Sequence, residues 1–342
     1  MFIKNELCLL KENIDSLSES FFFNPSISRY LKQCNSLIEE VIVKFDAIGP
    51  SFAAQISFII SQSIKYLSGS TSNKIPYEIV FSLEKALNDW VSEDHIICTA
   101  LLDDRDFHFN GIDLKNEVKA IFDFVGTPNL IHIALPKIYR HKYLYGPALY
   151  HELGHYIDDK YRISKFTFLV NNFTGTPEEV DREFSHRKEF FADLFSASYV
   201  GPSIVRFLND FAPGHPDCST HPSTARRVEI IEKFLRGEDC QELNRINLVL
   251  KFIKRPTLAI NFTIPDITDC FEDIKPYKIM HEKELHGIIP ASWAFFDKKA
   301  SHPTRRWEHL TSYDAEKIIN DLVEKSVRNY SVKEKWKNAT SN

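Results

Sequence analysis

The sequence predicts an α+β fold that is predominantly helical. Apolar residues recur at helical spacing along most of the chain, a few short segments alternate between apolar and polar residues, and only 11 of the 342 residues are glycine. The hydrophobic fraction of 43% and the charged fraction of 26% are typical of an ordinary globular protein. Because a chain of this length can bury a sizeable core, we expect two or three structural units.

Residues 1–94 are predicted to form a helical N-terminal region. The helical spacing continues to Trp90 and is interrupted at Asn24-Pro25, at Gly49-Pro50 and at the turn of residues 69–72. These interruptions predict about four helices.

Residues 95–255 are predicted to form the core domain, with a small sheet and several helices. One or two strands are expected in His95–Asn110 and another in Asn129–Leu135, where β-branched and aromatic residues gather. Pro147 suits the first turn of a helix, because its missing N–H is not needed there. The helices expected in this region cover residues 113–124, 147–159, 179–199 and 222–235.

Residues 256–342 are predicted to form a less regular C-terminal region. Residues 257–264 (TLAINFTI) resemble a strand, and a charged helix is expected from Asp314 to about Trp336. The composition does not indicate a fold class for this region.

Charge and hydropathy exclude several classes of protein. A net charge of −5 gives no reason to expect a nucleic-acid partner. Residues 1–10 lack the long apolar run of a secretory signal, and the most apolar stretch, residues 52–67, is too short and too polar for an integral membrane segment. The six cysteines contain no CxxC pair and are interpreted as reduced thiols. We therefore expect a cytoplasmic protein.

The motif His151-Glu152-Leu153-Gly154-His155 predicts a zinc site on a helix. Residues four apart share a helix face, so His151 and His155 can direct two imidazoles at one ion. Glu152 follows the first ligand and can reach a water molecule beside the metal, which makes it a candidate general base. The alternative is a surface helix that carries two histidines by chance.

Glu189 is the candidate third ligand, because a catalytic zinc site has three protein ligands and one open position. Glu189 and Asp193 are also four apart on a predicted helix, which places both carboxylates on one face. Asp193 is expected to accept a hydrogen bond from a ligand histidine and to fix its tautomer. His186 is the competing third ligand, and two surface acids are the alternative interpretation.

These motifs together resemble the gluzincin metallopeptidases. HELGH is followed 34 residues later by Glu189-x-x-Ala192-Asp193, and residues 221–227 (HPSTARR) are similar to the HPxxxxR segment of the HtpX heat-shock protease and CAAX prenyl endopeptidase family. The match covers residues 147–235. It implies a zincin-like core in residues 95–255 and a relative without the membrane spans of that family.

The resemblance also implies roles for His221 and Arg227, near the substrate or as braces for the active-site helices. His221 could donate a hydrogen bond to the oxyanion that develops on the scissile carbonyl, or its segment could simply begin the next helix. Arg227 is expected to pair with an acid near the site. In zincins an edge strand binds extended peptide, and residues 129–135 are the candidate, with His132 either in the cleft or at an ordinary sheet position.

The expected function is hydrolysis of peptide bonds in a peptide or protein substrate, with Zn²⁺ as the cofactor and Glu152 as base and acid. One alternative is a processing protease dedicated to a single regulatory or partner protein. Another is a degenerate zincin that acts as a binding or sensor module. A complete HExxH argues against the last of these, because a purely structural zinc site has no use for Glu152.

Overall fold

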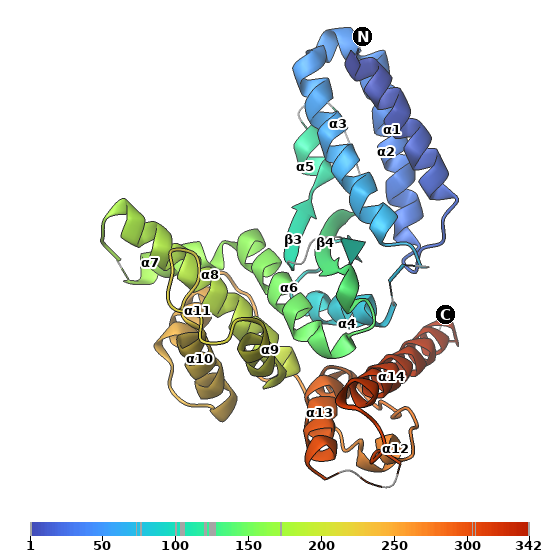
Figure 1. The fold of residues 1–342 in the computed structure, drawn as a ribbon. Coiled ribbons are helices and arrows are strands. Elements are labelled where there is room, and N and C mark those ends of the chain that lie inside the picture. Colours follow the sequence, from blue (N-terminus) through green and yellow to red (C-terminus); the bar gives the residue numbers. More distant parts are fainter. Residues whose placement is uncertain are drawn as a thin grey trace. The chain divides into compact units, whose positions relative to one another are not determined.

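The computed structural model describes residues 2–72, 74–75, 77–99, 101–102, 107–119, 122, 128–171, 173–302, 304 and 306–340. The protein is α+β and mostly helical, as predicted (Figure 1). Contacts between Cα atoms divide the chain into two compact units, each made of two segments. The first unit contains residues 1–80 and 92–140, and the second contains residues 81–91 and 141–342. The three-part division at residues 94 and 255 stays a prediction.

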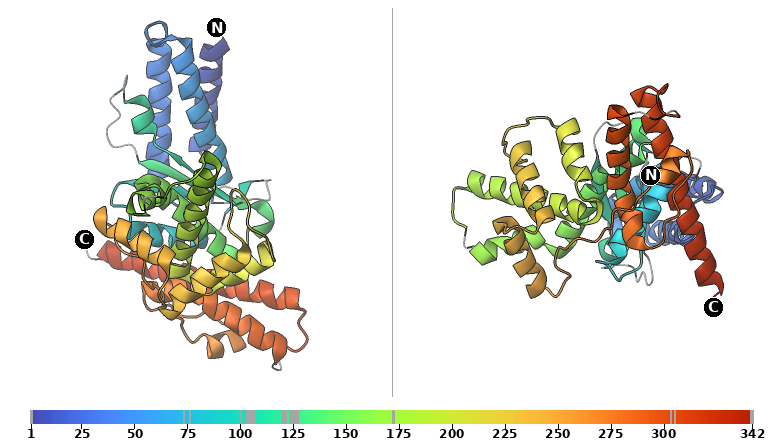
Figure 2. Two further views of the ribbon diagram at one scale, coloured as in Figure 1. Left: turned by 90° about the vertical axis from the view of Figure 1, so that its left-hand side faces the viewer. Right: turned by 90° about the horizontal axis from the view of Figure 1, so that it is seen from below.

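Three long helices of the first unit, α1 (Phe2–Ser18), α2 (Ser26–Val43) and α3 (Phe45–Gly69), lie side by side (Figures 1 and 2). With α4 (Tyr77–Asn88), which crosses the boundary between the units, they are the four helices predicted within residues 1–94. The predicted interruption at Gly49 is a kink inside α3, where φ is 78°. The break between α2 and α3 at Lys44 was not predicted.

The sheet of the first unit is built around β4 (Asn129–Pro136). Two short strands, β1 (His95–Cys98) and β2 (Leu101–Leu102), pair with it in parallel at the same register offset, and so form one interrupted row. The strand β3 (His108–Ile112) pairs with β4 in the antiparallel direction. Because β4 has partners on both sides, the prediction that it is an edge strand is wrong.

His132 lies in the middle of β4, and its side chain is fully buried. Its ring stacks on Tyr66 with centroids 3.6 Å apart. It therefore occupies an ordinary sheet position. The helix predicted over residues 113–124 is present as α5 (Leu114–Val118), with the Asp113 side chain accepting a hydrogen bond from the Asn116 N–H. Most of the remainder of that range lies outside the described residues.

The second unit is helical in the part that the structure describes. Three of its helices were predicted, within three residues at each end: α6 (Gly146–Tyr161), α8 (Pro177–Val200) and α10 (Thr224–Arg236). The predicted charged helix is α14 (Ser312–Thr340), which begins two residues earlier and ends four residues later. The helices that were not predicted are α7 (Ile163–Asn171), α9 (Ser203–Phe211), α11 (Gln241–Phe252), α12 (Thr268–Glu272) and α13 (Glu282–Ser301).

Residues 257–264 are not a strand, contrary to the prediction. Two of their backbone donors bond to helix carbonyls, the Asn261 N–H to Ser198 O and the Thr263 N–H to Lys283 O, and the Leu258 N–H donates to the Asn247 side chain of α11. A Cβ atom on Gly287 would lie only 1.9 Å from the Thr263 oxygen, so glycine allows the segment to lie against α13. The alternating sequence of this segment suggested a strand, but its backbone hydrogen bonds go to helices and not to a sheet.

Candidate metal centre

The first two candidate ligands are held by α6. Pro147 lies in the first turn of this helix, where a missing N–H costs nothing. The helix ends at Arg162, whose left-handed backbone (φ 55°) allows its N–H to donate to Asp158 O. His151 and His155 lie one turn apart between these ends, on one face of the helix.

The third candidate ligand is held by α8, whose start is strongly specified by the sequence. The Thr176 hydroxyl accepts a hydrogen bond from the Glu179 N–H, and the Glu179 carboxylate accepts one from the Thr176 N–H. This capping box, followed by Pro177, fixes the first turn. Glu189 and Asp193 follow near the middle of the helix, and both are buried.

Close packing of α6 on α8 brings the two sets of side chains together. A Cβ atom on Gly154 would lie 2.8 Å from the Ala192 Cα and 3.1 Å from the Phe195 Cβ. Real contacts of a Cβ with backbone are not this short, so a larger residue at position 154 would push the helices apart. The glycine of HELGH and the alanine of ExxAD therefore set the distance between the ligand-bearing helices.

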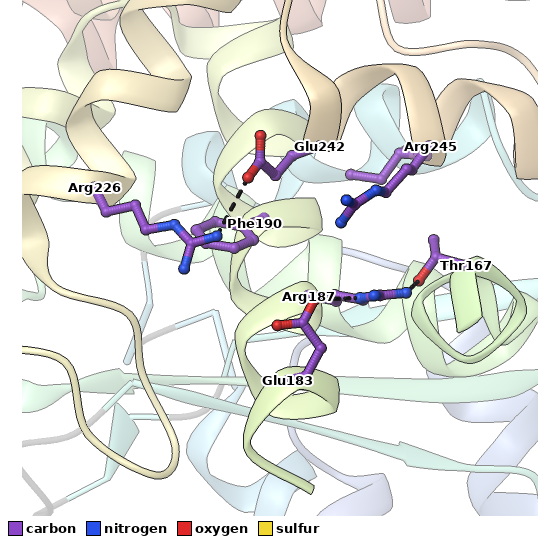
Figure 3. Close-up of a pocket in the computed structure, with 8 residues that line it drawn as sticks. Thr167, Glu183, Arg187, Phe190, Arg226, Glu242 and Arg245 are labelled. Carbon is purple, nitrogen blue, oxygen red and sulfur yellow. Dashed lines mark hydrogen bonds and ion pairs between the residues drawn. The ribbon is translucent and has the colours of Figure 1, made fainter. Parts of the chain in front are cut away.

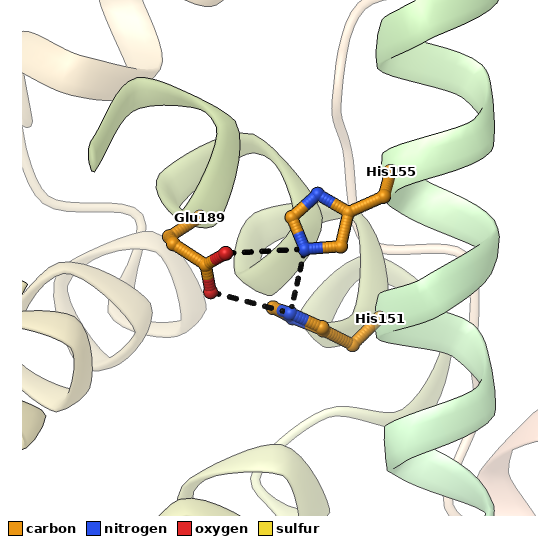
Figure 4. Close-up of side chains that lie close together, drawn as sticks. All are labelled: His151, His155 and Glu189. Carbon is orange, nitrogen blue, oxygen red and sulfur yellow. Dashed lines mark hydrogen bonds and ion pairs between the residues drawn. The ribbon is translucent and has the colours of Figure 1, made fainter. Parts of the chain in front are cut away.

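Three ligand atoms converge in the structure (Figure 4). The Nε2 atoms of His151 and His155 are 3.0 Å apart. The two carboxylate oxygens of Glu189 lie 3.4 Å from the His151 Nε2 and 3.3 Å from the His155 Nε2. All three residues are buried, with at most 9% of their surface exposed. This buried His-His-Glu group could hold a metal ion.

Asp193 and Arg227 contact the ligands from outside this group. The Asp193 Oδ1 lies 3.0 Å from the His151 Nδ1, on the side of the ring that faces away from the other ligands. Arg227 donates two hydrogen bonds of 2.7 Å to the Asp193 carboxylate, and its Nη2 lies 3.2 Å from a Glu189 oxygen. The guanidinium therefore holds both acids in place, as expected for an arginine paired with an acid near the site.

The pKa shifts show that the group favours a positive charge. Burial alone would lower the pKa of His151, but hydrogen bonds and charges from Asp193 and Glu189 outweigh it and raise the pKa to about 10. Burial would raise the pKa of Glu189, but the two imidazoles hold it well below its usual value. Burial would also raise the pKa of Asp193, but Arg227 and His151 outweigh this effect and lower it. A cation between these side chains would replace the proton on His151.

The donor set fits a zinc-sized divalent cation. With ligands about 2.0–2.1 Å from zinc, the edges of a tetrahedron are about 3.3–3.4 Å long. The two histidine Nε2 atoms, 3.0 Å apart, are near that length, and each also lies 3.3–3.4 Å from a Glu189 oxygen, a different oxygen for each histidine. Two imidazoles and one carboxylate are also a usual set for a catalytic zinc ion, since they leave a fourth position open.

No match emerges when the chain is compared with protein-family models, with curated proteins and with solved structures. The resemblance to gluzincins thus depends on the motif residues alone.

His221 lies beside the triad, half exposed on the loop that precedes α10. Its Nε2 is 3.7 Å from a Glu189 oxygen, and its Nδ1 is hydrogen-bonded to the Thr220 hydroxyl at 2.8 Å. Burial lowers the pKa of His221. The side chain that caps α10 is that of Ser223, which accepts a hydrogen bond from the Arg226 N–H. Ser223, and not His221, therefore caps α10. The His221 ring lies beside the candidate metal centre.

His186, the competing third ligand, is occupied elsewhere. Its Nε2 is hydrogen-bonded to the Cys218 carbonyl at 2.8 Å, which anchors the loop that carries His221. The sequence did not identify this role, nor that of Thr220. The one available signal was the position of His186, one turn before Glu189 on the same helix.

Glu152 is partly exposed, next to the first ligand. It contributes with Asp193 and Glu189 to the negative field that, against the effect of burial, raises the pKa of Arg227. Glu152 thus acts on the same group of charges while remaining partly exposed.

A second charged cluster lies on another face of α8 and lines a small cavity (Figure 3). Arg187 donates to Glu183 and to the Thr167 hydroxyl, and Arg226 donates to Glu242. These bonds join α7 to α8 and α10 to α11, and Arg226 also lies over the Phe190 ring of α8. Because Glu183 and Glu242 compensate two of the guanidiniums, we interpret the cluster as a brace between helices.

Proposed function

We propose that this chain is a zinc-dependent endopeptidase of the gluzincin type, with a zincin-like core that contains α6 and α8. The observation that carries the proposal is the convergence of His151, His155 and Glu189 on one buried point, with Glu152 beside it and not needed as a ligand. A site that only braced the fold would have no use for that carboxylate.

His151, His155 and Glu189 would hold the ion, which would supply Lewis-acid chemistry when bound by polarising a carbonyl group and acidifying water. Glu152 accepts a proton from the attacking water and later transfers it to the leaving amine. A C–O bond forms at the scissile carbonyl and the C–N bond breaks, so one water molecule is consumed.

The surrounding residues position the ligands and stabilise the charge that develops during the reaction. Asp193 fixes the tautomer and the orientation of His151, and Arg227 holds Asp193 and Glu189 in register. His221 donates from Nε2 to the oxyanion that develops on the carbonyl, with its ring oriented by the Thr220 hydroxyl.

The decisive test is Glu152→Gln, which keeps the shape of the side chain and removes its basicity. We expect the variant to retain zinc, measured by elemental analysis, and to lose about 10²–10⁴-fold in the cleavage rate of casein or of a random peptide library. The exposed acid Glu178 on α8 provides a matched control, and Glu178→Gln should cleave at the wild-type rate.

Wild-type cleavage should also be abolished by 1,10-phenanthroline. A zinc-loaded wild-type protein that cleaves neither library peptides nor cellular proteins in N-terminomics would contradict the enzyme proposal and favour a binding module. Full activity of Glu152→Gln would contradict the role given to that residue.

A further inference from the structure

The surface between α7 and α11 is apolar and open to solvent. It forms a groove with about 320 Å³ of free space. The side chains that line it come from both helices: Phe166, Leu169, Val170, Leu248, Val249 and Phe252. Leu169 is 72% exposed and Phe252 is 78% exposed, so both project from the surface. A contiguous apolar patch of this kind indicates a binding surface.

The two segments that carry the patch are basic. Residues 162–171 and 243–258 contain no acidic residue. Lys165 lies one helical turn before Leu169, and Lys251 and Lys254 lie beside Phe252. These three lysines are exposed, and within the part of the chain that the structure describes none of them has a carboxylate within ion-pair distance. Their charge is therefore available to an anionic partner.

A second copy of the chain is a poor occupant of this surface. A symmetric contact would bring the lysines of both copies into one small interface, and like charges gathered there cost free energy. Leu169 and Phe252 line the groove and are also largely exposed, so they can enter an apolar medium without rearrangement. Projecting apolar side chains with a basic rim are the usual features of a surface that inserts into the headgroup region of a bilayer.

We propose that the α7–α11 surface binds the surface of an anionic lipid bilayer. Leu169, Leu248 and Phe252 enter the headgroup region, while Lys165, Lys251 and Lys254 contact lipid phosphates. This mode of binding needs no membrane-spanning segment, and no described helix is long and apolar enough to be one. It does not depend on peptidase activity, so Glu152→Gln should bind vesicles like the wild type.

The test is co-sedimentation of the full chain with vesicles of phosphatidylcholine alone and of phosphatidylcholine mixed with phosphatidylglycerol. We expect binding only to the mixed vesicles, and weaker binding as salt rises. The double change Leu169→Ser and Phe252→Ser should abolish binding. The pair Lys165→Gln and Lys251→Gln should weaken it by about fivefold per lysine, or about 25-fold in all.

Matched controls come from exposed residues of the same unit. Met280→Ser and Ile264→Ser replace apolar side chains that are 54% and 53% exposed, and Lys278→Gln with Lys317→Gln removes two exposed lysines. These variants should bind mixed vesicles like the wild type. Absence of wild-type binding to mixed vesicles would overturn the proposal, and so would equal loss of binding in the control variants. A dimer in light scattering that the Leu169 and Phe252 changes dissociate, without vesicle binding, would show instead that this surface joins two copies.

Discussion

Arg227 is the residue on which the charge balance of the candidate metal centre depends most. Its two bonds to Asp193 and its contact with Glu189 compensate two buried carboxylates that lie side by side. Asp193 in turn contacts His151. A substitution at Arg227 therefore affects the ligand His151 through Asp193.

We expect Arg227→Met to lower the free energy of unfolding by about 3–5 kcal/mol, because it leaves a buried acid without its partner. Zinc affinity should fall by about 10–100-fold, since the residues that orient the ligands would be free to move. Urea denaturation and zinc titration measure the two effects. Arg226→Gln is the control: its partly exposed pair with Glu242 should contribute at most about 1 kcal/mol.

The sequence predicted which residues form the site better than it predicted the hydrogen bonds that hold them in place. The spacing of His151 with His155, and of Glu189 with Asp193, follows from the period of a helix, so four positions could be named in advance. The anchoring of the His221 loop by His186 could not, because it depends on the Cys218 carbonyl, and backbone carbonyls carry no sequence signal.

At the scale of elements, Gly154 controls the approach of α6 to α8. We expect Gly154→Ala to destabilise the protein by about 1–3 kcal/mol through overpacking, although alanine is the better helix former by about 1 kcal/mol. The variant should also bind zinc more weakly, because the ligands lie on the two helices that are forced apart. Thermal unfolding and zinc titration measure both changes.

Gly146→Ala is the matched control on the same helix. Its added methyl group would meet only the flexible end of Ile289, at 3.3 Å. Equal losses of stability and zinc affinity in the two variants would show that the contact with Ala192 is not what limits position 154.

A buried histidine of α13 should make the second unit sensitive to acid. Burial lowers the pKa of His286 to about 3 from an ordinary value of 6.5. Between those values the unfolded chain binds a proton at this residue and the folded chain does not. The stabilisation is therefore complete above pH 6.5 and falls by about 1.4 kcal/mol per pH unit as the pH decreases.

His286→Gln should remove this component of the pH dependence. Urea denaturation of both proteins at several acidic pH values isolates it, since every other titrating group is shared. The wild type should lose stability more steeply on acidification. Parallel curves would mean that His286 is already protonated in the folded protein.

Helices were predicted where capping residues mark their ends. They were missed where contacts with distant parts of the chain determine whether the helix forms. The start of α8 is indicated by Thr176, Pro177 and Glu179, which satisfy its first turn. The helix α13 contains Gly287 and Pro290, which predict a break. The structure shows why the glycine is there: residues 257–264 lie against it. That contact joins distant parts of the chain, and local spacing cannot reveal it.

At the scale of the whole molecule, the candidate metal centre belongs to the second unit alone. Removal of zinc by a chelator should therefore weaken that unit selectively. We expect hydrogen exchange to accelerate in α6, α8 and α10 and to stay unchanged in α1–α3. At a free zinc concentration about 1,000 times the dissociation constant, the loss on removal is about 4 kcal/mol. Equal acceleration in both units would indicate global unfolding as one cooperative body.

The division into interleaved segments has a consequence for synthesis on the ribosome. Residues 81–91 belong to the second unit but are made before the first unit is finished. Trp90 lies near the end of this stretch, and its indole is buried against Phe191, Phe195 and Tyr199 of α8. At ordinary translation rates, roughly 5–20 s pass between the synthesis of Trp90 and that of its contact residues on α8. During this interval it is a natural target for a holding chaperone.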